Sequence, residues 1–259
     1  MTDDDILLSH ARDRKAQCAD RGMLTHTAFL DLHQRSLLAA IEREQNADVR
    51  TFYHGGFPDA ERVIAIFVPT FYGVDDLPAY FAETPDNDPL CLLCAEKDAF
   101  STLSHRDYLG ALMGLGIKRE QLGDILVDDG GAYLVCLKTI RPFLLEHFSS
   151  AGRATLPLRD ASLDELHLTE AKTEDVFVSV PSLRLDCVIA AAYKLSRGKA
   201  EAAIQGGLAY VNAVLCDKPD KKLSVGDKLV LRGKGKCLLF AQTGESKKGR
   251  LHLTIRRYL

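Results

Sequence analysis

The sequence has no apolar run that approaches the ~20 residues needed to span a bilayer, which argues against a membrane-spanning helix. Its start, Met1 to Asp5, is acidic where a signal or transit peptide is basic. The seven cysteines are an odd number scattered along the chain, a usage typical of small apolar residues in a reducing compartment. We therefore expect a cytoplasmic protein that does not contact membranes.

Residue sets with the spacing of a metal or catalytic site are also missing. Cys91 and Cys94 have Cys-x-x-Cys spacing, but they fall in an apolar segment and no second pair follows at a useful distance. The triplet His105-Arg106-Asp107 begins like a kinase catalytic loop, yet no Gly-rich phosphate loop accompanies it. We expect no metal, no cofactor and no catalytic residues.

Charge is unevenly distributed along the chain. The net charge of −3 hides a segment from Val180 to Leu259 with 16 Lys and Arg against 6 Asp and Glu, a balance of +10. Because the whole chain has 33 against 36, residues 1–179 have 17 against 30. Such asymmetry suggests that the basic segment meets a polyanion.

Periodicity and turn residues predict an α+β protein of three parts. Residues 1–56 place apolar side chains near helical spacing, and Thr25 or Thr27 is expected to cap a second helix. A middle domain, residues 57–174, starts with the buried strand Val63–Val68. Residues 175–259 form the third part, with residues 160–175 as a polar linker or link strand before it.

From Leu90 the middle domain follows a β-α-β-β-α-β order, which predicts a ferredoxin-like, RRM-like α/β plait. We find no aromatic pair placed like the base-stacking motifs of RNA-recognition domains, so whether this domain contacts RNA stays open. The expected elements are a strand at 90–95, a helix beginning at Ser104 with Asp107 in a partial capping box, a hairpin at 125–137 turning at 129–131, a helix at 140–148 and a last strand near 155–158.

The basic third part predicts two short helices joined by a tight corner, followed by a small β-sheet. Ser182 is expected to cap the first helix and Ser196 the second, with Arg197 and Lys199 in the first turn of the second. Strands are expected at 208–211, 228–232, 236–242 and 251–258.

An ordered set of motifs in this part resembles the S-four domain, the RNA-binding domain named after small-subunit ribosomal protein four. The set comprises Ser182-Leu183-Arg184-Leu185-Asp186, Leu195-Ser196-Arg197-Gly198-Lys199-Ala200, Ile204, Gly207, Val211-Asn212 and Val225-Gly226-Asp227. Three further segments, 104–110, 115–125 and 231–236, are similar to the bacterial YlmH-type proteins, a likeness that spans nearly the whole chain. The resemblance implies an S-four-type αα-plus-small-β-sheet domain. It further implies binding to structured RNA, rRNA or tRNA on the large ribosomal subunit, with roles in rescue of stalled translation and in cell division.

Cations fixed on short helices suit A-form RNA, which is recognised mostly by shape, phosphates and 2′-hydroxyls. We expect Asp186 to position Arg184 or Arg197 rather than contact RNA. Family members often have Gly after the Asn of the turn; because Ala213 resists positive φ, we expect a wider or differently paired hairpin there. The candidate RNA-binding residues are Arg184, Lys194, Arg197, Lys199, Asn212, Arg232 and Lys234.

Two other functions fit the same sequence. An RNA-modifying enzyme, such as a pseudouridine synthase, can dock through an S-four domain, although residues 1–172 do not resemble its catalytic domain. An adaptor in cell division would instead use the acidic front part of the chain. We expect a monomer whose partner is structured RNA.

Overall fold

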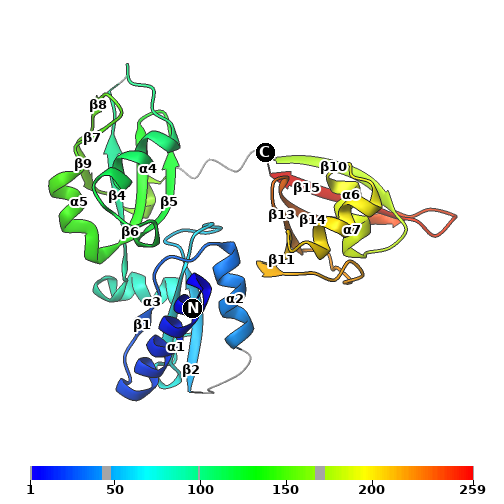
Figure 1. The fold of residues 1–259 in the computed structure, drawn as a ribbon, viewed down its shortest axis with the longest axis horizontal. Coiled ribbons are helices and arrows are strands. Elements are labelled where there is room, and N and C mark those ends of the chain that lie inside the picture. The colour runs from blue at the N-terminus through cyan, green and yellow to red at the C-terminus, as the bar shows by residue number, and fades with distance from the viewer. Residues whose placement is uncertain (1, 43–47, 99, 167–172, 259) are drawn as a thin grey trace. The chain divides into compact units, whose positions relative to one another are not determined.

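The chain divides between His167 and Leu168 into two compact units. A computed structural model describes residues 2–42, 48–98, 100–166 and 173–258, and Figure 1 shows the order of their helices and strands. The described residues form seven α-helices and several antiparallel sheets, so the expected α+β class is confirmed.

The first unit begins with two helices, α1 (Asp3–Arg21) and α2 (Leu32–Glu42). Thr2 caps α1: its hydroxyl accepts the Asp5 N–H at 3.2 Å, while the Asp5 carboxylate accepts the Thr2 N–H at 2.8 Å. Thr25 and Thr27 do not cap α2. The Thr27 hydroxyl accepts the Ala65 N–H at 2.9 Å, so it belongs to a sheet instead.

Residues 1–56 are not helical throughout, which corrects the prediction for this segment. Strands β1 (Thr25–His26) and β2 (Val49–His54) flank β3 (Ile64–Pro69) in an antiparallel sheet of order β1-β3-β2. The segment Val49–His54 has the β-branched and aromatic side chains that fit a pleated surface, a signal that the helical pattern around it obscured. The buried strand β3 therefore pairs with the N-terminal segment, not with the middle sheet.

The middle region has the expected succession of strands and helices. It runs β4 (Leu90–Glu96), α4 (His105–Gly114), β5 (Leu122–Val127), β6 (Gly131–Leu137), α5 (Arg141–His147) and β9 (Leu158–Asp160). The strand order is β5-β6-β4-β9, with every neighbouring pair antiparallel. A short pair, β7 (Ser150–Ala151) and β8 (Ala154–Thr155), precedes β9, and α3 (Leu77–Glu83) precedes β4.

The β5–β6 turn requires glycine. The Asp128 carboxylate accepts the N–H groups of Gly130 and Gly131, each at 2.8 Å. Gly131 has a φ of 150°, and a Cβ added there would lie 2.0 Å from the carbonyl oxygen of Ala95 on β4. The Asp-Gly-Gly sequence therefore fixes the hairpin and lets the neighbouring strand approach closely.

Both faces of the middle sheet are covered. On one face Leu93 and Leu134 pack with α4 and α5. On the other face Leu92 and Val135 pack with Phe29 and Ile66 from the N-terminal segment, in a second core that also includes residues of α3. The N-terminal segment thus covers the face of this sheet opposite α4 and α5.

The second unit is a sheet of six strands with two helices on one face. Its strands are β10 (Thr173–Val180), β11 (Ala209–Val211), β12 (Val214–Leu215), β13 (Lys228–Leu231), β14 (Gly235–Glu245) and β15 (Leu251–Tyr258), in the order β10-β15-β14-β13-β11-β12. Helices α6 (Leu185–Ala192) and α7 (Arg197–Gln205) pack on it through a core that includes Ile189, Ile204, Leu239 and Ile255. The expected helix pair and strands are present. Strand β10 extends beyond the expected linker or link strand, which ends at residue 175, and it pairs with β15 along all eight of its residues.

Two local predictions in this unit are wrong. Ser182 does not cap α6, because Arg184 is still extended, forms a bridge with Lys222 and occupies the cap position itself. The hairpin at Asn212-Ala213 is not widened: both residues adopt positive φ, 52° and 66°, and Val211 pairs directly with Val214. Ala213 therefore takes a conformation that costs an L-residue about 1–2 kcal/mol.

Candidate nucleic-acid interface

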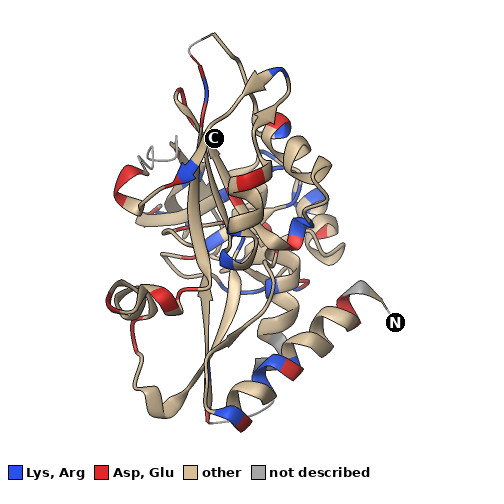
Figure 2. Cartoon of the chain, turned by 90° about the vertical axis from the view of Figure 1, so that its left-hand side faces the viewer, with Lys and Arg blue, Asp and Glu red and all other residues tan. Residues whose placement is uncertain are grey.

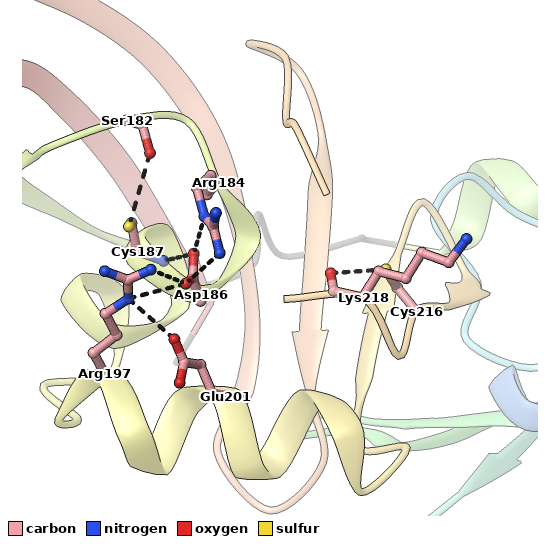
Figure 3. A network of polar contacts seen from close by, with 8 residues as sticks. All are labelled: Ser182, Arg184, Asp186, Cys187, Arg197, Glu201, Cys216 and Lys218. Carbon is pink, nitrogen blue, oxygen red and sulfur yellow. Dashed lines mark hydrogen bonds and ion pairs between the residues drawn. The ribbon is translucent and has the colours of Figure 1, made fainter. Parts of the chain in front are cut away.

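A buried carboxylate joins the two helices of the second unit (Figure 3). The side chain of Asp186, in the first turn of α6, is fully buried, and it receives two hydrogen bonds from Arg184, each at 3.1 Å. Arg197, in the first turn of α7, donates two more at 3.0 and 2.9 Å. The Cys187 N–H donates to the same carboxylate at 2.9 Å. The expected positioning role of Asp186 therefore has a geometric basis for both arginines.

The charge of Asp186 is stabilised in the folded protein. Burial by itself would raise the pKa of this carboxyl, but hydrogen bonds from Arg184, Arg197 and Cys187 outweigh that effect and lower the pKa to about 2. The two arginines remain partly accessible, with 37% and 56% of their side chains exposed. Arg197 also pairs with Glu201, one turn along α7, at 3.1 Å. The network holds two guanidinium groups at the surface with little conformational freedom.

Three lysines around the helix pair and the β13–β14 turn have exposed side chains. Lys199 lies in the first turn of α7, where its backbone N–H donates to the Ser196 hydroxyl at 3.3 Å, so Ser196 caps the helix as expected. Lys194 occupies the corner between the helices with a φ of 53°, and Lys234 lies in the β13–β14 turn. No carboxylate pairs with any of the three within the described residues, so their charges are available to an anion.

A tyrosine connects the helix corner to the β13–β14 turn. The Tyr193 hydroxyl donates to the carbonyl oxygen of Gly235 at 2.8 Å. Lys194 and Lys234 each directly adjoin one of these two residues, so the hydrogen bond places both lysines at one end of the unit. Arg232 lies farther along, with its guanidinium 6.0 Å from the ring of Tyr210.

The Asn212 amide connects two turns. Its nitrogen donates to Asp227 at 2.8 Å, and its oxygen accepts the Lys228 N–H at 2.9 Å. These hydrogen bonds tie the β11–β12 turn to the Val225-Gly226-Asp227 turn of the S-four-like motif. The Asn212 amide, which we expected to contact RNA, therefore already uses its oxygen and one N–H in hydrogen bonds within the protein.

Two further lysines escaped the sequence reasoning. Lys221 and Lys222 lie on the loop that runs beside the start of α6, where the Leu185 N–H donates to the Lys221 carbonyl at 2.9 Å and Arg184 bridges with Lys222. Both side chains are exposed. The sequence signal that could have identified these two lysines was their position as a pair directly after Asp220. Only the pairing of this loop with the start of α6 brings the two lysines close to Arg184.

The first unit has a groove of different character. It is about 1240 Å³ in volume. Residues along α1 line it, together with residues of β1 and of the segment that directly precedes β5. Both signs of charge alternate along α1, as Figure 2 shows near the N-terminus. A surface of mixed sign does not favour a polyanion.

The described residues form no metal site, disulfide or membrane-spanning helix. Among the described residues no group of three or more His, Cys, Asp or Glu is placed to hold a metal ion. All seven cysteines are free thiols. No helix in the described parts of the chain has the length and apolar character to cross a membrane.

Fold and surface thus define a mixed α+β chain whose basic second unit presents ordered cations around a two-helix corner. The chain is 30% identical over 255 residues to the ribosome-associated protein quality control protein P2 of Bacillus subtilis (strain 168), an alignment that covers 98% of this chain and 95% of that protein. Residues 93–165 match the family described as "Putative RNA-binding domain in YlmH". The chain therefore belongs to the YlmH family, which confirms the resemblance found in the sequence.

One solved structure is also similar. The cell division protein ylmH from Streptococcus pneumoniae shares 21% sequence identity and a TM-score of 0.49, with 64% of this chain and 94% of that chain covered.

Proposed function

We propose that this protein binds structured RNA through its second unit, with rRNA or tRNA on the large ribosomal subunit as the target, and acts in rescue of stalled translation. The observation that carries the proposal is the buried Asp186, which holds Arg184 and Arg197 on two different helices beside the exposed Lys199. A buried carboxylate that orients two surface cations is consistent with a surface that binds phosphates.

The name of the Bacillus subtilis relative supports a ribosomal role. A ribosomal partner would agree with the cytoplasmic location expected from the free cysteines. In this proposal the protein acts by binding and not by catalysis, as a monomer.

Domain assignments belong to the same proposal. The strand order β5-β6-β4-β9, with α4 and α5 on one face, supports our assignment of a ferredoxin-like plait. We assign residues 175–259 to an S-four-type domain, with β10 extending its sheet, and residues 57–174 to the middle domain. The first strand of that span, β3, packs with the N-terminal segment 1–56.

The family match at residues 93–165 raises the question of whether the middle region also contacts RNA. Its sheet cannot stack bases on the face opposite α4 and α5, because Leu92 and Val135 are buried there against Phe29. Two of its arginines are also paired with carboxylates: Arg141 with Asp160, and Arg159 with Glu96. Both observations favour the second unit as the principal RNA surface.

The test compares the full chain with residues 168–259 and residues 1–167 in binding to a labelled rRNA stem-loop. We expect the 168–259 fragment, which keeps β10, to retain most of the affinity. Its affinity should fall steeply between low and physiological salt as counterions are released. Binding by residues 1–167 alone would overturn the assignment.

Two readouts separate the other candidate functions. An RNA-modifying enzyme would leave a mass change on the RNA after incubation, whereas a binding factor would only sediment with ribosomes. A cell-division adaptor would keep its activity after residues 168–259 are removed.

A further inference from the structure

The sheet of the second unit has a face that α6 and α7 do not cover. Along β10 the side chains of Val178 and Val180 point into the core, so Asp175, Phe177 and Ser179 lie on the opposite face. The same alternation places Thr254 and Arg256 of β15 on that face, since Leu253 and Ile255 are buried in the core. We call this surface the outer face.

Two aromatic rings stand out on the outer face. Phe177 on β10 is 78% exposed and Phe240 on β14 is 43% exposed. They lie on the two strands that flank β15: Phe177 pairs with Thr254, which pairs in turn with Ala241, the neighbour of Phe240. Two strand spacings therefore separate the strands that carry the rings, a distance of about 10 Å.

A guanidinium group is fixed over one of these rings, that of Phe240. The Arg256 side chain lies 3.8 Å from the centre of the Phe240 ring, and it donates two hydrogen bonds to Asp175, at 2.8 and 2.9 Å. A second cation, Lys236, lies 4.8 Å from the centre of the Tyr258 ring at the end of β15. A surface on which flat rings alternate with cations is suited to unpaired nucleotides, because the bases stack on the rings while the cations neutralise the phosphates.

The β14–β15 loop extends the positive charge beyond the outer face. It carries the exposed Lys247 and Lys248 and projects past the other strands of the sheet (Figure 1). Arg250 anchors the base of this loop by donating to the Ser179 hydroxyl at 3.1 Å. A partner that covers the rings and also reaches the loop would meet two lysines, which favours a polyanion with flat rings over an apolar protein surface.

We propose that the outer face binds unpaired nucleotides of an RNA, with Phe177 and Phe240 as stacking platforms and the Lys247-Lys248 loop contacting the phosphates. This inference rests on the proposed RNA-binding function and adds a second site to it. The helix corner around Asp186 would hold a helical stretch of RNA, and the outer face would hold an adjoining single strand. The covered middle sheet has no comparable platform among its described residues.

The experiment uses the full chain and two probes, a fluorescein-labelled oligouridylate about twelve nucleotides long and a blunt RNA duplex of similar length. Phe177→Ala and Phe240→Ala should each weaken oligouridylate binding by at least about fivefold. Both variants should leave duplex binding within about twofold of the wild type, because the helix corner is unchanged. Phe71→Ala, at an aromatic side chain that is 75% exposed in the first unit, is the matched control and should change neither.

Conservative variants distinguish stacking from apolar contact. Phe177→Trp should retain oligouridylate binding, whereas Phe177→Leu should lose it although the side chain stays apolar. An oligonucleotide with a 2-aminopurine base reports stacking directly, through a fluorescence change that the Phe177→Leu variant should not produce.

Two results would overturn the inference while the proposed function stands. One is wild-type oligouridylate affinity in both alanine variants; the other is full oligouridylate binding by Phe177→Leu, which would show that the Phe177 ring is not a stacking platform. A wild-type chain that binds neither probe would overturn the proposed function together with this inference.

Discussion

The side chains of Asp186 and Arg197 connect the first turns of α6 and α7 through two hydrogen bonds of 3.0 and 2.9 Å. The carboxylate is fully buried while the guanidinium is 56% exposed, so the pair spans the boundary between core and surface. One interaction thus serves two purposes: it sets how the helices meet, and it orients a cation for a ligand.

Replacing Asp186 should destabilise the second unit. Asp186→Asn keeps the shape of the side chain but leaves the arginines facing an amide without charge. Because Arg184 and Arg197 are partly solvated, we expect a loss of about 2–3 kcal/mol in the free energy of unfolding, below the cost of breaking a fully buried pair. Urea denaturation at neutral pH measures it. A loss under about 0.5 kcal/mol would contradict the role given to this carboxylate.

The same pair predicts a pH dependence. The pKa of Asp186 is lowered in the folded chain from 3.8 to about 2, so its contribution is complete above about pH 4 and is lost as the pH falls from there towards 2. The stability difference between wild type and Asp186→Asn should therefore stay constant at higher pH and shrink within that window. A difference that persists unchanged at pH 2 would contradict the assigned pKa.

The turn at Asn212-Ala213 gives a stabilising substitution. Ala213 holds a φ of 66°, so Ala213→Gly should raise the free energy of unfolding by about 0.5–1 kcal/mol. The matched control is Ala202→Gly, at an exposed position inside α7, which should lower stability by about 1 kcal/mol. Destabilisation by both glycines would show that the turn is not strained.

This turn also shows where sequence reasoning reaches its limit. The unfavourable conformation of Ala213 was identified correctly, but the expected response, a wider hairpin, was not. The two hydrogen bonds of the Asn212 amide to Asp227 and Lys228, from a segment about fifteen residues away in the sequence, favour the tight turn. The local preference of alanine for negative φ was overridden by hydrogen bonds to a distant segment, which no local sequence pattern reveals.

The helix corner and the middle β-α-β-β-α-β succession were predictable because their signals are local: apolar periodicity, caps at Ser104 and Ser196, and the Asp-Gly-Gly turn. The outer face was not, because Phe177 lies between the expected linker, residues 160–175, and the first expected helix of the third part, where the sequence predicts no strand. Its exposure follows only from the pairing of β10 with β15. Likewise, the cover on the middle sheet depends on β3 pairing with distant β1 and β2.

Cys91 should be the most reactive of the seven thiols. Its exposure is intermediate whereas the other six are buried, and its sulfur lies 3.3 Å from that of Cys136 on the neighbouring strand. A hydrogen bond from the Cys136 thiol lowers the pKa of Cys91, whereas the pKa of Cys136 is raised. Limited alkylation followed by peptide mass spectrometry should label Cys91 first, and Cys91→Ser should abolish this early label. Earlier labelling of Cys18 or Cys237, whose pKa values burial raises, would contradict the prediction.

The cations at the helix corner should differ in how their removal affects the protein. Lys199 is exposed and makes no ion pair within the described residues, so Lys199→Ala should weaken binding to a structured RNA, reduce the salt slope by roughly one unit and leave the melting temperature unchanged. Arg197→Ala should weaken binding as well, but it should also lower the melting temperature, because Asp186 loses two of its donors. Arg12→Ala, an exposed cation on α1, is the control and should alter neither quantity. Unchanged affinity and slope in both corner variants would place the RNA elsewhere, and Arg232 and Lys234 would then be tested next.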